Sequence, residues 1–404
     1  MNQRPYTVLC LASYEKGEDL LRECKQQGCS VILVTIEKLK DSPLWPRECI
    51  DEFFVMPNPD LTKQPDITYA ISYLARSRKI DCLIALDEFD IEVAAALREH
   101  LRIPGMGDTT ARYFRDKLAM RIQAKDSGLL VPAFSRVVNY DELREFMERV
   151  PPPWVLKPRT SASAIGIKKI RASEELWPAL DALGDKQSFH VLEQFVPGEI
   201  YHVDSIVSES EVVFANVQKY GSPPLNVMHD GGIFTSYGVT RGSADEQALQ
   251  ACNQDILTAF KMVRGVTHAE FIKGHADGKF YFLEIASRVG GAYINEVVKA
   301  ASGINLWREW ARVEITRRDN EAYQLPPMKH DYAGIIITLA RQEQPDLSGY
   351  TDAEIVFRIE KKHHAGLVVE APDAARVQAL LESYTERFYQ DFHTSAPPPD
   401  KPTA

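Results

Sequence analysis

Three features are scarce in this chain of 404 residues: cysteine, long apolar runs and positive charge. The six cysteines, at positions 10, 24, 29, 49, 82 and 252, include no Cys-x-x-Cys pair. This scatter disfavours a disulfide framework or a thiolate metal site and predicts reduced thiols. The most apolar run, 333–340, is far shorter than the ~18–20 residues of a membrane span. The N-terminus reaches Glu15 and Lys16 too early for a signal peptide. We therefore expect a cytoplasmic protein outside the membrane.

The charge balance excludes another class of protein. The chain carries 57 acidic and 47 basic residues, for a net charge of −10. Such a surplus argues against non-specific binding to nucleic acid, although it leaves room for a local basic pocket that binds an anion. Neither a GxGxxG motif after the first predicted strand nor a Walker A loop is present. A dinucleotide site and a P-loop are therefore not indicated.

The first 110 residues alternate between two kinds of segment. Apolar runs at 6–12, 30–36, 53–56 and 81–86 predict strands, and amphipathic segments at 18–27, 67–77 and 91–100 predict helices. This alternation favours a parallel sheet covered by helices. Asp87 and Glu88 directly follow the last of these strands. They either face a ligand at the carboxyl edge of the sheet, or Asp87 caps the next helix.

The remaining chain predicts a mixture of helices and antiparallel strands. A basic helix is expected over 111–127, and three prolines at 151–153 form a break. Strands follow at 154–157, 167–170, 190–195, 200–207 and 212–217, and a hairpin joins 268–272 to 279–285. One helix is predicted over 292–315. The tail at 394–404 has the composition of a disordered segment.

Lys157 ends an apolar strand and is followed by the loop 159–166, which is rich in small residues. The backbone N–H groups of such a loop can approach phosphate oxygens closely. Taken alone, the pattern also fits a lysine that reaches solvent beside an ordinary loop.

A second segment with polar residues runs from Leu192 to Asp204. Its Pro197-Gly198 pair frees backbone groups that can bind the edge of an adenine ring. The two-residue period of a strand then places Ile200, His202 and Asp204 on one face. A simple solvated face explains the same alternation.

The most informative segment contains Glu270 and Glu284, which lie 14 positions apart on the two strands of the predicted hairpin. Two carboxylates on one sheet face repel each other unless a cation lies between them, and Mg²⁺ prefers such oxygen ligands. Arg288 follows with a guanidinium suited to phosphate or carboxylate. We expect Gly290 and Gly291 to open a helix whose first N–H groups bind an anion. Carboxylates on an outer hairpin face remain the alternative.

Together these segments carry a family resemblance. The series Phe114-Arg-Asp-Lys117, Val155-Leu-Lys157-Pro, Glu193-Gln-Phe-Val196-Pro-Gly and Glu270…Glu284-Ile-Ala-Ser-Arg288 resembles the ATP-grasp superfamily of carboxylate–amine ligases over roughly residues 1–310. The Glu-x-Ala-x-Arg segment is most similar to the L-amino-acid ligase type. The resemblance implies an α/β protein, with an N-terminal Rossmann-like parallel-sheet domain (1–112) before a two-subdomain, α+β ATP-grasp fold. Its lid subdomain would span 113–195 and its C-terminal subdomain, with the metal site, 196–393.

The resemblance also implies roles for individual residues. Lys117 and Lys157 would contact the ATP phosphates, with Lys157 and Arg288 as the catalytic cations. The residues expected to contact the nucleotide further comprise a phosphate loop with Ser161, Ser163 and Gly166 and an adenine hinge at Glu193, Gln194, Phe195 and Val196. The ribose partner would be Glu199 or His202, with Asp204 as a further option, because Ile200 stands where an acid is usual. Glu270 and Glu284 would bind Mg²⁺, or Mn²⁺ in its place. Ala286 stands where the family often has an asparagine ligand. The number of bound ions, one or two, is therefore left open.

The implied reaction is ATP-dependent amide formation. A small carboxylate, of amino-acid type, would become an acyl phosphate that an amine attacks, releasing ADP and phosphate. The loop 226–232 either forms a flexible turn or holds substrate; the expected substrate residues are His229, Asp230, Gly231, Arg288, Gly290 and Gly291. The alternatives are a bicarbonate-using carboxylase and a non-catalytic nucleotide-binding regulator. The partners would be small molecules, with neither nucleic acid nor membrane, and a homodimer is compatible with the family.

Overall fold

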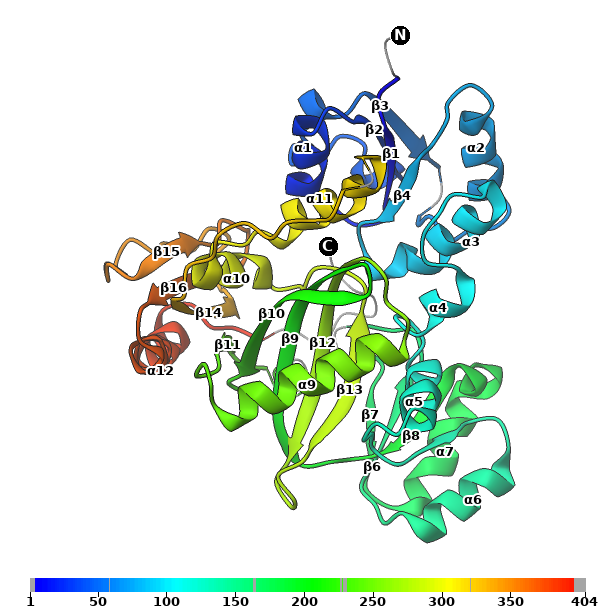
Figure 1. Cartoon of the computed structure of the whole chain (residues 1–404). Coiled ribbons are helices and arrows are strands. Elements are labelled where there is room, and N and C mark those ends of the chain that lie inside the picture. The colour runs from blue at the N-terminus through cyan, green and yellow to red at the C-terminus, as the bar shows by residue number, and fades with distance from the viewer. Residues whose placement is uncertain are drawn as a thin grey trace.

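The computed structural model describes residues 4–57, 59–162, 165–225, 227, 231–319 and 321–395, and these residues form three β-sheets (Figure 1). The first sheet is parallel and has the strand order β3-β2-β1-β4. Its strands are β1 (Thr7–Ala12), β2 (Ser30–Ile36), β3 (Glu52–Met56) and β4 (Cys82–Ala85). Because helices cover both faces of a parallel sheet, β1 and β2 are apolar and buried along nearly their whole length. The predicted α/β class is confirmed.

Helices from distant parts of the chain complete the core of the first sheet. The chain before residue 102 contributes α1 (Glu18–Gln26), α2 (Asp66–Ala75) and α3 (Ile91–Leu101), with the short turns η1 (Glu37–Leu39), η2 (Arg47–Cys49) and η3 (Glu88–Asp90). Helix α11 (Leu306–Asp319), from much later in the chain, packs on α1 (Figure 1). Leu306 and Trp310 of α11 join the same buried cluster as β1 and β2.

The predicted helix over 111–127 is wrong, because the chain forms two helices there. They are α4 (Asp108–Arg112) and α5 (Lys117–Asp126). Asp116 adopts an extended conformation, and its Oδ1 accepts the N–H of Leu118 at 2.9 Å, which begins the second helix. This cap makes Lys117 the first residue of α5.

The second sheet is small and antiparallel, with the order β5-β8-β6-β7. It comprises β5 (Phe134–Arg136), β8 (His190–Gln194), β6 (Trp154–Pro158) and β7 (Lys168–Ile170). Two helices, α6 (Tyr140–Arg149) and α7 (Ser173–Leu183), with the turn η4 (Gly184–Phe189), accompany it. Phe146, Trp154 and Leu176 form its separate core.

The third sheet has eight antiparallel strands in the order β13-β12-β9-β10-β11-β14-β16-β15. The strands are β9 (Gly198–Ser208), β10 (Glu211–Tyr220), β11 (Phe234–Gly238), β12 (Gly265–Gly274), β13 (Phe280–Ala286), β14 (Tyr332–Leu339), β15 (Ile355–Arg358) and β16 (His364–Ala371). Helix α9 (Ala244–Ala259) crosses the β9–β13 half, and α10 (Ile294–Ser302) and α12 (Ala374–Asp391) contact β14 and β16 (Figure 1). The predicted hairpin is confirmed as β12–β13.

The predicted helix over 292–315 is also wrong. Helix α10 ends at Gly303, whose φ of 78° is the left-handed conformation that glycine adopts at low cost. Asn305 then caps α11, since its Oδ1 accepts the N–H of Trp307 at 3.1 Å. The break lets α10 pack on β14 and β16, whereas α11 packs on α1 and on β9 and β12.

The division at residues 112, 195 and 393 remains our proposal for the domains. The N–H of Thr394 donates to the carbonyl of Leu339 at 3.0 Å, so the beginning of the predicted tail contacts β14; residues 396–404 lie outside the described part. No helix in that part is long and apolar enough to cross a bilayer.

Candidate functional site

Glu270 and Glu284 are direct partners across the β12–β13 pair. The side chains of Glu270 and Glu284 keep 14% and 32% of their surface exposed, so both carboxylates remain accessible. Cross-strand partners of like charge destabilise a sheet unless other groups balance them. The groups around each carboxylate therefore show how its charge is balanced.

Glu270 is held by two neighbours. The hydroxyl of Tyr220 donates to its Oε1 at 2.8 Å, and His268 Nε2 lies 3.4 Å from the same oxygen. Burial alone would raise the pKa of Glu270, but these partners lower it below its ordinary value. The carboxylate is thus anionic, and its Oε1 is fixed in direction.

Glu284 is balanced by Lys117, whose Nζ lies 2.9 Å from Glu284 Oε2. The same Nζ donates to the carbonyl of Ser161 at 2.7 Å, which joins α5 to the loop after β6. Arg159 reinforces this junction, since its carbonyl accepts the N–H of Lys117 and its guanidinium pairs with Asp116. A cation therefore already lies beside the carboxylate pair.

Lys157 is buried, with 3% of its surface exposed, and is not a solvent-reaching lysine. Its Nζ lies 2.8 Å from Glu193 Oε2, and Arg121 Nε lies 3.0 Å from the other carboxylate oxygen of Glu193. Burial lowers the pKa of Lys157 to about 8, against the opposing charge of Glu193. The lid thus holds a second cation at the end of β6.

The adenine hinge needs a correction. The backbone of Glu193 is paired on both sides, with Phe134 and with Val155, while its side chain neutralises Lys157 and Arg121. The N–H groups of Gln194 and Phe195 are taken by the carbonyls of Ala133 and Pro153 at 2.7 and 3.0 Å. Within the described chain, only Val196 among these four leaves its N–H without a backbone partner.

An apolar surface adjoins Val196. Val196 packs with the buried cluster of Ile200, Tyr220 and Ile272, which Tyr281 and Leu283 extend. An aromatic base binds well between such side chains and a free backbone N–H. Of the ribose candidates, Glu199 is partly exposed and pairs with Lys219, so its role stays a prediction, whereas His202 and Asp204 are fully buried.

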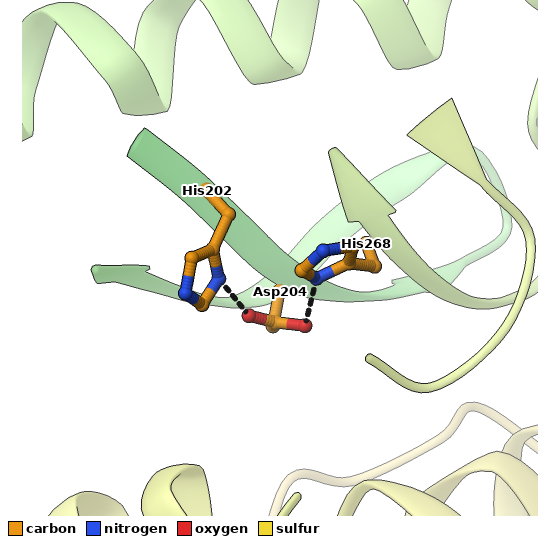
Figure 2. A group of neighbouring side chains, drawn as sticks. All are labelled: His202, Asp204 and His268. Atoms are coloured by element: carbon orange, nitrogen blue, oxygen red, sulfur yellow. Dashed lines mark hydrogen bonds and ion pairs between the residues drawn. The ribbon is translucent and has the colours of Figure 1, made fainter. Parts of the chain in front are cut away.

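His202 belongs to a buried hydrogen-bonded cluster with Asp204 and His268 (Figure 2). His202 Nδ1 lies 2.7 Å from Asp204 Oδ2, and His202 Nε2 lies 2.8 Å from the hydroxyl of Ser236. Both ring nitrogens are occupied, so this geometry does not support a contact between His202 and ribose. His268 Nδ1 binds the other oxygen of Asp204 at 2.9 Å.

The phosphate loop is described only in part, because Ser163 lies outside the described residues. The carbonyl of Ser161 accepts from Lys117. Gly166 has a φ of 75°, and a Cβ added there would lie 2.9 Å from Pro158 Cγ. Both facts require glycine at position 166, which lets the loop turn back over the end of β6.

Arg288 meets the first sheet across the interface with the third. Its Nη2 and Nε lie 2.6 and 3.0 Å from Glu88 Oε1, and Arg115 Nη1 lies 3.2 Å from Glu88 Oε2. Burial would raise the pKa of Glu88, but the two guanidinium groups lower it to about 2. Two fixed cations share one carboxylate, so the cluster has a positive excess suited to an anion.

Of the two interpretations of Asp87 and Glu88, the structure confirms the cap at Asp87, and a ligand at Glu88 stays a prediction. Asp87 accepts the N–H of Phe89 at 3.1 Å as a cap, and it also binds Lys16. Glu88 binds Arg288 and Arg115.

The predicted substrate residues do not all meet at Arg288. His229 and Asp230 lie outside the described residues. Gly231 lines a cavity of about 460 Å³ with residues of α12, together with Thr235 and Tyr237. Ser236 points to the opposite face of β11, toward His202. This placement does not support Gly231 as a substrate residue.

Gly290 and Gly291 do not open a helix, which is a further correction. Helix α10 begins at Ile294, after Ala292 and Tyr293 adopt left-handed conformations with φ of 49° and 58°. A Cβ on Gly290 would lie 2.9 Å from both Asp204 Oδ1 and His268 Nδ1. Glycine is therefore required at position 290 by close packing on the buried cluster.

Three site residues escaped the sequence analysis: Arg121, Arg115 and Tyr220. Arg121 lies one helical turn after Lys117 on α5. The (i, i+4) spacing could have predicted that both side chains lie on the same helix face. Nothing in the sequence brings Tyr220 to Glu270, because their strands are joined to β9 from opposite sides.

Residues 150–296 match the ATP-grasp domain family. An L-arginine-specific L-amino acid ligase of Bacillus subtilis is 24% identical over 320 residues, covering 77% of this chain and 76% of the ligase. For the L-amino acid ligase structure from Bacillus licheniformis, the TM-score is 0.76 at 15% identity, with 97% of this chain and 99% of that chain covered. For the N5-carboxyaminoimidazole ribonucleotide synthetase structure from Thermus thermophilus, the TM-score is 0.71 at 17% identity, with 96% of this chain and 99% of that chain covered. The structural likenesses show a shared fold.

Proposed function

We propose that this chain is an ATP-grasp ligase that activates an amino acid with ATP as an acyl phosphate and joins it to an amine. The observation that carries this proposal is the Glu270–Glu284 pair with Lys117 on one of its carboxylates. The family implies ATP as a substrate, and the L-arginine-specific relative favours an amino acid as the acid to be activated.

The triphosphate needs positive charge, which this acidic chain supplies from three separate segments. Lys117 begins α5, Lys157 ends β6, and Arg288 follows β13. In phosphoryl transfer the protein mainly positions the reactants and neutralises charge. We assign the two lysines to the ATP phosphates and Arg288 to the phosphate being transferred.

The carboxylate pair fits a divalent cation. The ammonium of Lys117 already lies beside Glu284, and both carboxylates offer the oxygen atoms that Mg²⁺ and Mn²⁺ accept. A cation bound by Glu270 and Glu284 would supply charge neutralisation at the phosphates. Lys117 would then turn from Glu284 toward the nucleotide, keeping its contact with the Ser161 carbonyl.

The acid would bind where Arg288 and Arg115 face Glu88. Two guanidinium groups against one carboxylate leave net positive charge for a substrate carboxylate. The carboxylate oxygen attacks the terminal phosphorus of ATP, the bond to ADP breaks, and the amine then displaces phosphate from the acyl carbon. The lid must exclude water, because an acyl phosphate hydrolyses readily.

A panel of acceptors tests the proposal. Phosphate release from Mg-ATP should require an amino acid, and release should increase with pairs of amino acids. Glu284→Ala should abolish the release without changing thermal unfolding. Glu354→Ala, which removes an exposed partner of Arg376, is the control and should keep full activity.

The outcomes separate the alternatives. Release that depends on bicarbonate and not on amino acids would show a carboxylase and refute our proposal. Tight ATP binding without release in any mixture would show a nucleotide-binding regulator. Wild-type turnover in Glu284→Ala would refute the assignment of the carboxylate pair.

A further inference from the structure

A chain of hydrogen bonds begins at Glu270 and runs into the interior of the third sheet. The Tyr220 hydroxyl donates to Glu270 Oε1 at 2.8 Å, and His268 Nε2 lies 3.3 Å from the same hydroxyl. His268 Nδ1 then lies 2.9 Å from Asp204 Oδ1. Figure 2 shows the carboxylate of Asp204 between the two imidazoles of His202 and His268.

The order of donors along this chain follows from the chemistry of its groups. Asp204 can only accept, so both Nδ1 atoms donate to it. The single tyrosine proton goes to Glu270, so the tyrosine oxygen is left as an acceptor for His268 Nε2. Each member thereby fixes the direction of the next, and Glu270 keeps Oε2 for another partner.

Burial separates this chain from direct contact with substrates. Asp204 and His202 are completely buried, and Tyr220 and His268 are 6% and 8% exposed. Gly290 closes the chain from the side of Arg288, since even a Cβ there would lie 2.9 Å from the Asp204–His268 pair. Asp204 and His268 therefore reach Glu270 only through hydrogen bonds and not through a shared substrate contact.

We propose that Asp204, acting through His268 and Tyr220, is a positioning residue that fixes Glu270 for a divalent cation. This inference rests on the proposed function, which places the cation at Glu270 and Glu284. A carboxylate ligand that is already oriented loses less freedom when the ion binds, and hydrogen-bond partners of metal ligands contribute about 10–100-fold to affinity.

The cluster itself is not the cation site in this interpretation. The ligand atoms of His202, Asp204 and His268 lie within 4.8 Å of one another, a spacing that a metal could use. Both imidazoles, however, already donate protons to Asp204, and a metal would require those nitrogens without protons. The contacts of Asp204 are complete without an ion.

Binding of Mn²⁺ in the presence of ADP tests the proposal without relying on turnover. Tyr220→Phe removes the hydroxyl and keeps the ring, which packs on His202 and Phe234 at centroid distances of 4.7 and 5.5 Å. Electron paramagnetic resonance of free Mn²⁺ should show about 10–100-fold weaker binding in this variant.

Tyr350→Phe is the matched control. Tyr350 is buried and donates to Asp391 at 2.9 Å, in the core beside α12. It loses the same kind of bond far from the site, so its Mn²⁺ affinity should equal that of the wild type. Unchanged affinity in Tyr220→Phe, or equal losses in both variants, would overturn the proposal.

A second variant tests the far end of the chain. Asp204→Asn should weaken Mn²⁺ binding in the wild-type background and have a much smaller effect in Tyr220→Phe. Independent, multiplicative effects would overturn the role of Asp204.

Failure of the proposed function is recognised separately. If Glu270→Ala binds Mn²⁺ as well as the wild type does, the cation site itself is wrong. If Glu270→Ala loses binding and Tyr220→Phe does not, the site stands and only the positioning chain fails.

Discussion

Glu88 and Arg288 lie 200 positions apart in the sequence, yet Arg288 Nη2 contacts Glu88 Oε1 at 2.6 Å. The contact joins the carboxyl edge of the first sheet to the segment after β13 of the third. It fixes the arginine between two sheets that share one buried cluster, because Ile206 of β9 and Val266 of β12 pack with the residues of β1 and β2. The same contact gives the protein a predictable response to acid.

Glu88 should make stability depend on pH in the acidic range. The folded-state pKa of Glu88 is lowered to about 2 from an ordinary 4.5, so its contribution is present above about 4.5 and is lost as pH falls toward 2. The contribution is about 3 kcal/mol at neutral pH. Urea unfolding at pH 7 and pH 3 should show a smaller loss in Glu88→Gln than in the wild type. Parallel losses in both would contradict this assignment.

Lys157 should limit the use of ATP at alkaline pH. Burial lowers its pKa to about 8, so its charge is lost as pH rises through that value. The kcat/KM for ATP, which reports the free enzyme, should therefore fall above pH 8. Lys157→Arg keeps the charge and should move this decline to higher pH. An alkaline limb at the same pH in both proteins would exclude Lys157 as its source.

Gly166→Ala should raise the KM for ATP at least about tenfold, because it combines left-handed strain of about 1–2 kcal/mol with a clash. The added Cβ would lie 2.9 Å from Pro158 Cγ and displace the phosphate loop. Gly128→Ala is the matched control, since its φ is 79° and nothing lies within 4 Å of the new Cβ. Both variants should lose similar stability in thermal unfolding, and only Gly166→Ala should change the KM.

Arg121→Met should destabilise the lid by roughly 3 kcal/mol, because it leaves the buried charge of Glu193 with Lys157 as its remaining close cation. Guanidinium unfolding measures this loss. Arg136→Met, which breaks an exposed pair with Glu142, should cost less than about 1 kcal/mol. Equal losses would show that burial of Arg121 adds nothing.

The local sequence pattern predicted most of the helices and strands and singled out the main lysines, the arginine and the carboxylates. The apolar runs of β1 and β2 and the β12–β13 hairpin are contiguous, so their hydrophobic period is readable in the sequence. The helices at 111–127 and 292–315 were misread because Asp116 and Asn305 act as caps within segments that otherwise have a helical period.

The positions of interior polar groups could not be read in this way. His202 follows the same alternation as a ribose-binding residue would, and only its contacts with Asp204 and Ser236 show that it is buried. Gly231 and Gly290 both lie in segments that the sequence predicted to hold substrate. Packing against Ser395 and against Asp204 decides their surroundings.

The sequence alone determined which chemical groups are available: two lysines, an arginine and two carboxylates, in an order that resembles the ATP-grasp ligases. Tertiary structure alone decided which of these groups touch. Lys117 meets Glu284, Arg288 meets Glu88, and Tyr220 orients Glu270. These contacts join segments up to 200 positions apart. A distance across sheets depends on the packing of their cores, which no local period records.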